Sequence, residues 1–490
     1  MDQEKLLRTV ARIHAYGRPV DVTKPFITAD RYKGVGTGFF IPPPTHADSE
    51  DLYLLTCAHV VDSADSVTIM LPLHGLTEHP ASVLAFIPSY DLALIAVPGA
   101  NTTLSQQTEP VTLGSSDKLK LGQKLTAVGY PLGQTAIKVS DGVYAGFQEK
   151  LQHTVSISPG NSGGPLMDES GAVVGVNSSG IVSPEASNVG FAVPIEMFAL
   201  MSNQMFARSR GAPSPERVIH LPIFGFEFAP ITKSHSRVVS TATCSSNPHD
   251  GGVQIVSVVP GSAMASVVEQ GDILVEFDGT PIDTIGEIVV PWNYQKVRLQ
   301  DMLVRSVQDR EYDLRVWKQA TRSCAEYKVK PRPGAQNGLR MIYSPYDVVP
   351  YTVVVGLVIM PLLANHAMAP ATAQTYLRKN TEDLAKPSLI ITHVFNGTLA
   401  QIEGPVYAGD ELSHVNGREV TTLDDVHAAI VQDDTDADTR RVVTFRTCDG
   451  KLLVLNHMDA LQSEQRAMSE KLYDPEPTFM KFLSLERNTK

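Results

Sequence analysis

The sequence predicts a mostly β protein with some helix, organised in several domains. From about residue 5 to residue 200, short aliphatic and β-branched runs alternate with Gly, Pro, Asn and Asp, a rhythm typical of an all-β sandwich or barrel. Further along, two segments repeat each other at a fixed separation, which indicates a duplicated module. The length of 490 residues, at about 150 residues per domain, predicts roughly three domains.

The first segment contains the elements of the predicted barrel. The expected strands, each a short apolar run, are 35–41, 53–57, 67–71, 93–97, 124–129, 173–176 and 190–193. A helix over 195–207 closes this segment, and the run 208–216, rich in Pro, Gly and Ser, is a predicted linker. Before the barrel, Leu6, Leu7, Val10 and Ile13 have helical spacing, which predicts an amphipathic helix that needs a partner surface.

The repeated module occupies residues 217–335 and again 336–460. Gly271-Asp272 recurs as Gly409-Asp410, 138 residues further on. Each copy predicts a strand, a short helix, a Gly-Asp turn, a strand, an Asp-Gly or Asn-Gly hairpin and a helix. In the second copy the apolar run 348–363 is interrupted by prolines and rich in β-branched residues, so it predicts a buried strand rather than a membrane span. Residues 461–490 are charged and predict a partly ordered tail.

Composition excludes some classes of function. Hydrophobic residues make up 43% and charged residues 19% of the chain, which is ordinary for a globular protein. The formal net charge of −12 and the lack of a basic cluster in the sequence argue against nucleic acid or an anionic membrane as a partner. A Walker-type phosphate-binding motif is also missing from the sequence, so no nucleotide-driven motor is predicted.

Cysteine usage and the first residues predict a compartment. The four cysteines, Cys57, Cys244, Cys324 and Cys448, lie far apart and have no metal-ligand spacing, so reduced thiols and no metal or cofactor are expected. The sequence begins with an acidic, amphipathic stretch rather than an apolar signal. Together these features predict an intracellular protein of a reducing compartment, such as the cytoplasm or nucleus.

The strongest chemical signal is a serine in a glycine-rich turn. The run 158–165, Ser-Pro-Gly-Asn-Ser-Gly-Gly-Pro, places Ser162 between glycines, where the backbone can approach a ligand closely. In such a turn the N–H groups of Gly160 and Ser162 can point the same way and stabilise a developing oxyanion. We therefore expect Ser162 to be a nucleophile and these two residues to supply the oxyanion hole.

A serine hydroxyl needs a base and a group that orients the base. His59 stands at the end of an apolar strand, and Asp91 stands at the start of a buried one. The chain order His, Asp, Ser is one of the orders known for this catalytic constellation. His153, on the strand that leads to Ser162, is a rival base, and Cys57 is a rival nucleophile.

These motifs resemble those of the HtrA/Deg serine proteases, in which a trypsin-like double β-barrel protease domain precedes PDZ-like α+β domains. The matching blocks, in chain order, are 37–41, 55–61, 90–94, 128–133, 158–166 and 190–194. Residues 1–207 resemble the protease domain and the repeated module resembles the PDZ domains. The insertion before Val297 and the strand around Val355–Leu362 are similar to plant-type Deg proteases with a degenerate second PDZ domain.

The resemblance implies a role for each matching residue. Ser162 corresponds to the nucleophile, His59 to the general base and Asp91 to the acid that orients it. The specificity pocket corresponds to Asn188, Val189, Gly190 and Phe191, whose apolar character implies small to medium aliphatic side chains before the scissile bond. The carboxylate-binding loop of the first PDZ domain corresponds to Ile223, Phe224, Gly225 and Phe226.

The predicted function is that of an ATP-independent serine endopeptidase acting on unfolded or extended polypeptides. The resemblance also implies a homo-oligomer, a trimer or hexamer, in which the second module serves assembly more than peptide capture. Two alternatives stay open at this point. In the first alternative the chain is a catalytically silent PDZ scaffold or chaperone. In the second it is a structural component of a larger particle.

Overall fold

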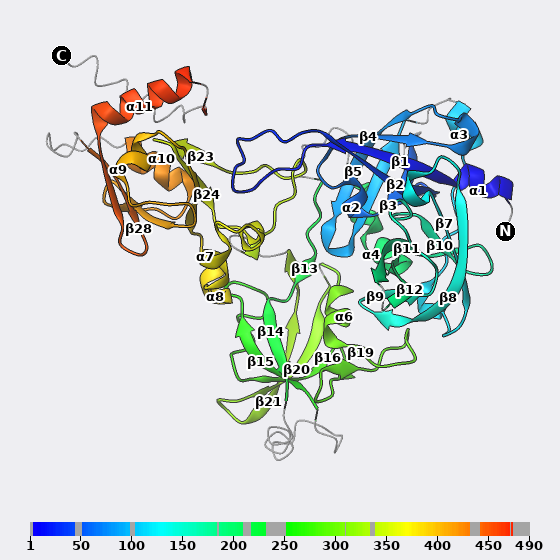
Figure 1. Cartoon of the computed structure of the whole chain (residues 1–490). Coiled ribbons are helices and arrows are strands. Elements are labelled where there is room, and N and C mark those ends of the chain that lie inside the picture. Colours follow the sequence, from blue (N-terminus) through cyan, green and yellow to red (C-terminus); the bar gives the residue numbers. More distant parts are fainter. Residues whose placement is uncertain are drawn as a thin grey trace. The chain divides into compact units, whose positions relative to one another are not determined.

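The computed structural model describes residues 3–44, 51–98, 103–183, 186–208, 217–231, 251–308, 310–333, 339–431, 442–470 and 472–473. They form two compact units: Met1–Pro19 with Asp30–Gly334 and Tyr343–Asp347, and Val20–Ala29 with Ala335–Ile342 and Val348–Lys490. Figure 1 shows the elements of each unit along the chain. Among the helices of the described residues, none combines the length and apolarity needed to cross a membrane. The predicted linker 208–216 lies, except for Arg208, outside the described residues.

The first closed barrel confirms the β rhythm of the N-terminal segment. Its strands, in the order in which they pair around the barrel, are β1 (Val10–Gly17), β2 (Tyr32–Ile41), β3 (Leu52–Thr56), β6 (Leu92–Val97), β5 (His79–Ile87) and β4 (Ala64–Met70). The short helices α1 (Gln3–Thr9) and α2 (Ala58–Val61) accompany it. Leu54 and Ile95 are among the fully buried side chains that fill its interior. α2 follows directly from β3 and holds His59.

The prediction of a long N-terminal helix is wrong beyond Thr9. Val10 and Ile13 belong to β1 and are fully buried in the core of the first barrel, and Leu6 on α1 is buried in the same core. Residues three apart share a face of a helix but lie on opposite faces of a strand. Because β1 is buried on both faces, apolar residues occur at both kinds of position, and the spacing alone did not separate helix from strand. These side chains therefore need no surface on a second molecule.

The second closed barrel holds Ser162, between β9 and β10, and the strand predicted to line the specificity pocket. Its strands, in pairing order, are β10 (Pro165–Met167), β11 (Val173–Ser183), β12 (Ala186–Pro194), β9 (Lys150–His153), β8 (Lys138–Gln148) and β7 (Lys124–Gly129). α3 (Thr103–Gln107) lies between the barrels in sequence, and α4 (Ile195–Phe206) confirms the helix predicted over 195–207. α4 buries Ile195, Met197 and Phe198 against the same core as the first barrel, which ties the two barrels together.

The first copy of the repeated module is built on an antiparallel sheet. Its main strands, in pairing order, are β14 (Phe226–Pro230), β15 (Val253–Val258), β16 (Ile273–Phe277), β20 (Tyr312–Lys318) and β21 (Ser323–Val329). Shorter pieces are β13 (Pro222–Ile223), β17 (Thr280–Pro281), β18 (Glu287–Ile288), β19 (Val297–Arg298), β22 (Arg332–Pro333) and helix α6 (Leu299–Val304). Cys324 on β21 is disulfide-bonded, so the prediction of four reduced thiols is wrong at this position.

The second copy repeats this plan with one strand added. Its strands, in pairing order, are β23 (Thr352–Val354), β24 (Leu357–Pro361), β25 (Leu389–Val394), β26 (Glu411–Val415), β28 (Val442–Thr447) and β29 (Leu452–Asn456), with β27 (Arg418–Glu419) beside β26. Its helices are α7 (Ala373–Leu377), α8 (Thr381–Leu384), α9 (Leu399–Glu403), α10 (Leu423–Val431) and α11 (His457–Ser469). Val354, Leu357 and Ile359 are fully buried in the module's own core, so most of the apolar run 348–363 is covered without a partner.

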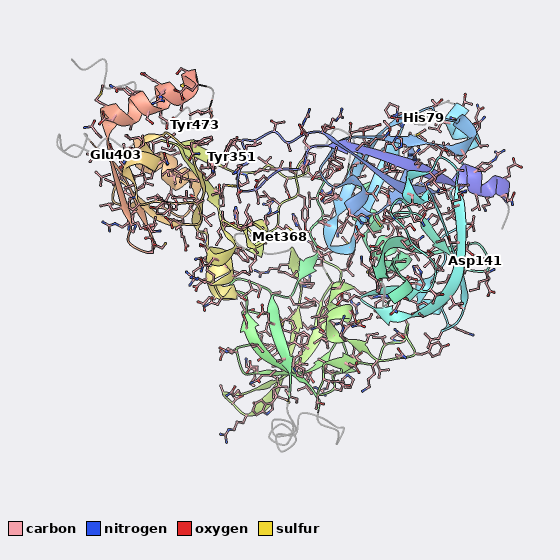
Figure 2. All side chains as sticks on the ribbon, viewed as in Figure 1. His79, Asp141, Tyr351, Met368, Glu403 and Tyr473 are labelled. Atoms are coloured by element: carbon pink, nitrogen blue, oxygen red, sulfur yellow. The ribbon has the colours of Figure 1, made fainter. Side chains whose placement is uncertain are left out.

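Helix α11 crosses the boundary expected at residue 460. Leu461, Glu464 and Ala467 are buried, and Tyr473, which lies just past the helix (Figure 2), is 6% exposed. The sequence suggested a tail here because most positions of the helix are polar and the buried face is narrow. Glu464 accepts a hydrogen bond from the backbone N–H of Val355, at the turn between β23 and β24. Burial, the largest effect, raises the pKa of Glu464 to about 7.

This buried carboxyl predicts a pH-dependent stability for the second module. The native pKa of Glu464 lies above its ordinary value of 4.5, so the native state binds more protons between these two pH values and stability falls as the pH rises through that window. The expected loss is on the order of 3 kcal/mol. E464Q stays neutral and is expected to flatten this dependence, measured by calorimetry of the full chain from pH 5 to 8. E470Q, at the exposed end of the same helix, is the matched control; an equal effect of both changes would contradict the prediction.

Two short segments belong to a different unit from the residues on either side of them in the sequence. Val20–Ala29, which separates β1 from β2, is part of the second unit, where the rings of Phe26 and Phe395 have centroids 4.4 Å apart. Tyr343–Asp347, which precedes β23, is part of the first unit. There the ring of Tyr346 stacks on Phe86 at 4.6 Å between centroids. Each of the predicted domain ranges 1–207 and 336–460 therefore contains one short segment that belongs to the other unit.

Candidate active site

His59 and Asp91 form a close pair. His59 Nδ1 lies 2.8 Å from Asp91 Oδ1 and 3.0 Å from Oδ2, and the backbone N–H of His59 donates to Oδ1 at 3.1 Å. Asp91 follows the 3₁₀ turn Pro88–Tyr90 and adopts left-handed backbone angles (φ 59°, ψ 42°), which aspartate tolerates better than most residues. The turn thus aims the carboxylate at α2, and a carboxylate on Nδ1 leaves Nε2 of the ring free to act as a base.

Asp91 is held in its ionised form. Burial by itself would raise the pKa of Asp91, but hydrogen bonds from His59 and from Ser178 outweigh burial and hold this pKa below its ordinary value. Ser178 Oγ on β11 donates to Asp91 Oδ2 at 2.5 Å. The side chain of Asp91 is 16% exposed while that of His59 is 49% exposed. The pair therefore presents the imidazole to solvent and keeps its counter-charge inside.

Ser162 lies on a turn that only glycine neighbours permit. Gly160 and Gly163 have φ of 99° and 85°, in the region that side chains disfavour. A Cβ on Gly160 would lie 2.3 Å from the Tyr130 carbonyl oxygen, and one on Gly163 would lie 2.1 Å from Thr56 Oγ1. The first barrel also fixes this turn, because the backbone N–H of Thr37 donates to the Ser162 carbonyl at 2.9 Å.

The peptide between Pro159 and Gly160, whose amide is predicted to belong to an oxyanion hole, is oriented by one backbone hydrogen bond. The carbonyl of Pro159 accepts a hydrogen bond from Leu132 N–H at 2.6 Å. Because C=O and N–H of one trans peptide point in opposite directions, the Gly160 N–H points away from Leu132. Within the described residues, neither Gly160 N–H nor Ser162 N–H donates to a protein acceptor, whereas Asn161 N–H between them donates to Ser158. Two unused amides, one on either side of Asn161, can stabilise negative charge on a reacting oxygen.

The hydroxyl of Ser162 is hydrogen-bonded to the backbone rather than to the imidazole. Ser162 Oγ donates to the carbonyl of Ser178 at 3.0 Å, and in the described part of the chain no hydrogen bond joins it to His59. Hydrogen bonds between nucleophile and base are often long or missing until substrate binds. Ser178 thus contacts both ends of the predicted triad, through its side chain to Asp91 and through its carbonyl to Ser162.

The two rival residues, His153 and Cys57, are buried in the core and not at the surface where a substrate binds. His153 is fully buried on β9, and a Cβ on the opposite residue, Gly190, would lie 2.2 Å from its ring. Burial lowers the pKa of His153 to about 4, so this ring is a neutral filler behind Gly190. Cys57 is fully buried, its Sγ donates to the Asn177 carbonyl at 3.1 Å, and burial raises its pKa. A thiol in this state is a poor nucleophile.

The predicted specificity residues lie on β12, between β11 and β9. Gly190 is buried, and Val189 and Phe191 are half-buried. The side chain of Asn188 lies outside the described residues. Sequence reasoning missed Ser178 and Lys150, which face Asp91 from β11 and β9. A Ser in an Asn-Ser-Ser run and a Lys in a strand are too common to signal a site by themselves.

The loop predicted to bind a carboxylate turns into an edge strand. Gly225 has φ of 80°, and a Cβ there would lie 2.2 Å from the Cβ of Ser262, so only glycine fits. Phe224 is buried in the module core, and Phe226 begins β14. β14 pairs with β15 on one side, and no described strand of this sheet pairs with its other side. The geometry therefore leaves an edge to which an extended peptide could add.

The family model described as "Trypsin-like peptidase domain" matches residues 36–176. The "Putative serine protease HhoB" of Synechocystis is 29% identical over 53% of this chain and 60% of its own. The "Probable periplasmic serine endoprotease DegP-like" of Chlamydia pneumoniae is 31% identical over 51% of this chain and 48% of its own. This chain therefore spans only about half to three fifths of the length of these relatives.

Among solved structures, "HtrA-type protease AlgW with tripeptide" covers 67% of this chain and 94% of its own, with a TM-score of 0.49 and 19% identity. The names of several relatives contradict one prediction. Proteins from Chlamydia and Halomonas elongata are named periplasmic endoproteases, which overturns the expected reducing compartment such as the cytoplasm or nucleus. The disulfide at Cys324 agrees with this correction, because structural disulfides belong to oxidising compartments.

Proposed function

Because the chain belongs with the HtrA/DegP-like serine proteases and has a trypsin-like peptidase domain over residues 36–176, we propose that it is a serine endopeptidase. Its substrates are unfolded or extended polypeptides. The observation that supports this most is the pairing of His59 Nδ1 with the buried Asp91 carboxylate at 2.8 Å, on the chain that also holds Ser162 in a glycine turn. An orienting carboxylate on one imidazole nitrogen is what a general base for a serine requires.

In the proposed reaction, His59 Nε2 takes the proton of Ser162 as Oγ attacks the substrate carbonyl. The carbonyl oxygen becomes an oxyanion, which the Gly160 and Ser162 amides stabilise, and Asp91 stabilises the imidazolium. His59 then returns the proton to the leaving amine, the peptide bond breaks and an acyl-enzyme remains. A water molecule activated by His59 hydrolyses this ester and restores Ser162.

Active-site labelling distinguishes this proposal from a catalytically silent scaffold. A fluorophosphonate reacts only with a serine that an aligned base activates. We expect stoichiometric labelling of the full chain at Ser162, identified by mass spectrometry of the tryptic peptide, and no labelling of S162A. An intact, folded chain that stays unlabelled while it suppresses aggregation of a model substrate would support the scaffold instead.

We predict cleavage after small or medium aliphatic residues such as Val, Ala or Ile. The described part of the specificity strand, Val189 to Phe191, is apolar, and His153 behind it is neutral because its pKa is lowered to about 4. A charged side chain there would lose hydration without gaining a partner. Mass spectrometry of casein digests should show most cuts after aliphatic residues. A majority of cuts after Lys, Arg, Asp or Glu would contradict this reading of the pocket.

The two copies of the repeated module are proposed to differ in peptide capture. In the first, the open edge of β14 supports binding of an extended peptide. In the second, the matching strand β24 already pairs with β23, from Thr352 opposite Ile359 to Val354 opposite Leu357. Thr352 of β23 also contacts α10, because its Oγ1 lies 3.2 Å from His427 Nε2. β23 therefore occupies the place beside β24 where a peptide would otherwise add. We therefore expect substrate peptides to bind the first copy only.

We further propose that the protein works outside the cytoplasm and forms a trimer or a hexamer. The names of the relatives and the disulfide at Cys324 support the location. The oligomer rests on the resemblance alone, since the apolar residues that suggested an interface, Val10 and Ile13 and most of 348–363, are buried in their own modules. Light scattering of the full chain should give three or six times 53.2 kDa. A monodisperse monomer would contradict the prediction.

A further inference from the structure

Lys150 is a second cation close to Asp91, the predicted catalytic acid. It lies at the start of β9, on the second barrel. Its Nζ donates to Ser178 Oγ at 2.7 Å and lies 3.8 Å from Asp91 Oδ2. The side chain is 35% exposed, so it is partly shielded from water. Among the described cationic side chains, only His59 and Lys150 form an ion pair with Asp91.

The direction of these hydrogen bonds follows from the chemistry of the groups. An ammonium has three donors and no acceptor, so Lys150 must donate to the oxygen of Ser178. The hydroxyl proton of Ser178 is then directed to Asp91 Oδ2, which lies 2.5 Å away. Asp91 Oδ1 accepts from the backbone N–H of His59 and lies 2.8 Å from the ring Nδ1, which also lies 3.0 Å from Oδ2. The same residue, Ser178, holds the Ser162 hydroxyl through its carbonyl.

Resting on the function proposed above, we propose that Lys150 is a positioning residue of the active site. Its ammonium locks the Ser178 hydroxyl onto Asp91 and offsets part of the negative charge that this carboxylate offers to His59. A carboxylate beside an imidazole favours the protonated ring, and a cation beside that carboxylate opposes this effect. Lys150 therefore weakens the attraction between the Asp91 carboxylate and a protonated His59 ring.

Other titratable groups face the same cluster and enter the balance. Asp62 follows α2, and its interaction with His59 is attractive when both are charged. Burial raises the pKa of the Cys57 thiol well above its ordinary value, so this neighbour stays neutral. Glu149, next to Lys150, is paired with Arg298 at 2.6 Å and its charge is thereby offset. Lys150 is thus the group whose removal changes the charge facing Asp91 most directly.

The test compares three variants and a control. K150M removes both the charge and the donor, K150Q keeps a donor without the charge, and K150R keeps both. K124M is the control: Lys124 also pairs with an aspartate, Asp141 Oδ2 at 3.2 Å, but on the exposed surface of β7 and β8, where Figure 2 labels Asp141. The readouts are the acid limb of the kcat/KM profile for a peptide substrate and the NMR titration of the His59 ring in the full chain.

We expect the acid limb and the His59 midpoint to move upward by about half a pH unit to one unit in K150M and K150Q. K150R should restore the wild-type values, and K124M should leave them unchanged. Unchanged midpoints in K150M, or an equal shift in K124M, would overturn the proposal, and a wild-type midpoint in K150Q would overturn its electrostatic part. The NMR titration needs no turnover, so an inactive wild-type chain would refute the proposed function and leave Lys150 testable.

Discussion

Ser162→Ala is expected to reduce peptide-bond cleavage by the full chain about 10⁴- to 10⁶-fold while the protein stays folded. The hydroxyl makes a single hydrogen bond, to the Ser178 carbonyl, so its loss leaves the glycine turn and the barrel contacts of Thr37 in place. What is lost is the atom that forms the acyl bond. Casein hydrolysis by the purified variant, relative to wild type at equal concentration, measures the effect.

S202A is the matched control for this change. Ser202 is a half-buried serine on α4 whose hydroxyl donates to a carbonyl, as Ser162 does, but outside the predicted active site. Its activity should equal that of the wild type. Thermal unfolding of both variants should stay within about 1–2 °C of wild type, since each loses one weak hydrogen bond. Cleavage by S162A above one tenth of the wild-type rate would exclude Ser162 as the nucleophile.

Asp91→Asn is expected to lower kcat about 10³- to 10⁴-fold, with a smaller effect on KM. The carboxylate accepts from the His59 ring, the His59 backbone and Ser178, and it is mostly buried. An amide in its place offers one oxygen and one NH₂ group, so either the ring or the Ser178 hydroxyl meets a donor. The imidazole then adopts the wrong tautomer, and the imidazolium loses its counter-charge. Steady-state kinetics on a peptide substrate measures both constants.

D141N serves as the control for the aspartate. Asp141 is exposed on β8, accepts from Thr126 at 2.7 Å and pairs with Lys124, so the change from carboxylate to amide is similar but far less buried. Its kinetics should match those of the wild type. Nearly full activity of D91N would mean that another group orients His59, and Asp91 would lose its assigned role.

The β-barrel fold and the glycine turn at Ser162 could be predicted because both depend on local patterns. Short apolar runs between turn residues mark the strands, and the glycines around Ser162 mark a turn that the observed φ values require. Local patterns do not predict the structure where one spacing of apolar residues is compatible with both a helix and a strand. Val10 and Ile13 fit a helix and a strand, and the burial of both in the barrel core is decided by β2 and β4, with which β1 pairs.

The rest of the site depends on contacts between strands that are distant in sequence. Ser178 reaches Asp91 across 87 positions, and Lys150 reaches Ser178 across 28. No spacing rule links such residues, because the register of strands β9, β11 and β12 brings them together. The disulfide at Cys324 was missed for a similar reason, since cysteine spacing says little about proximity in a large chain.

Tyr346 supports α2, the helix that holds His59, from a position far downstream in the sequence. Its hydroxyl donates to the carbonyl of Val61, the last residue of α2, at 2.7 Å across 285 positions, and its ring is 2% exposed. A chain shortened after the first repeated module keeps His59, Asp91 and Ser162 but leaves that carbonyl and the ring of Phe86 uncovered. The residues of the predicted active site and the C-terminal half are therefore not separable by a single cut. If recombination replaced the C-terminal half with that of another gene, the N-terminal half would have to keep Tyr346.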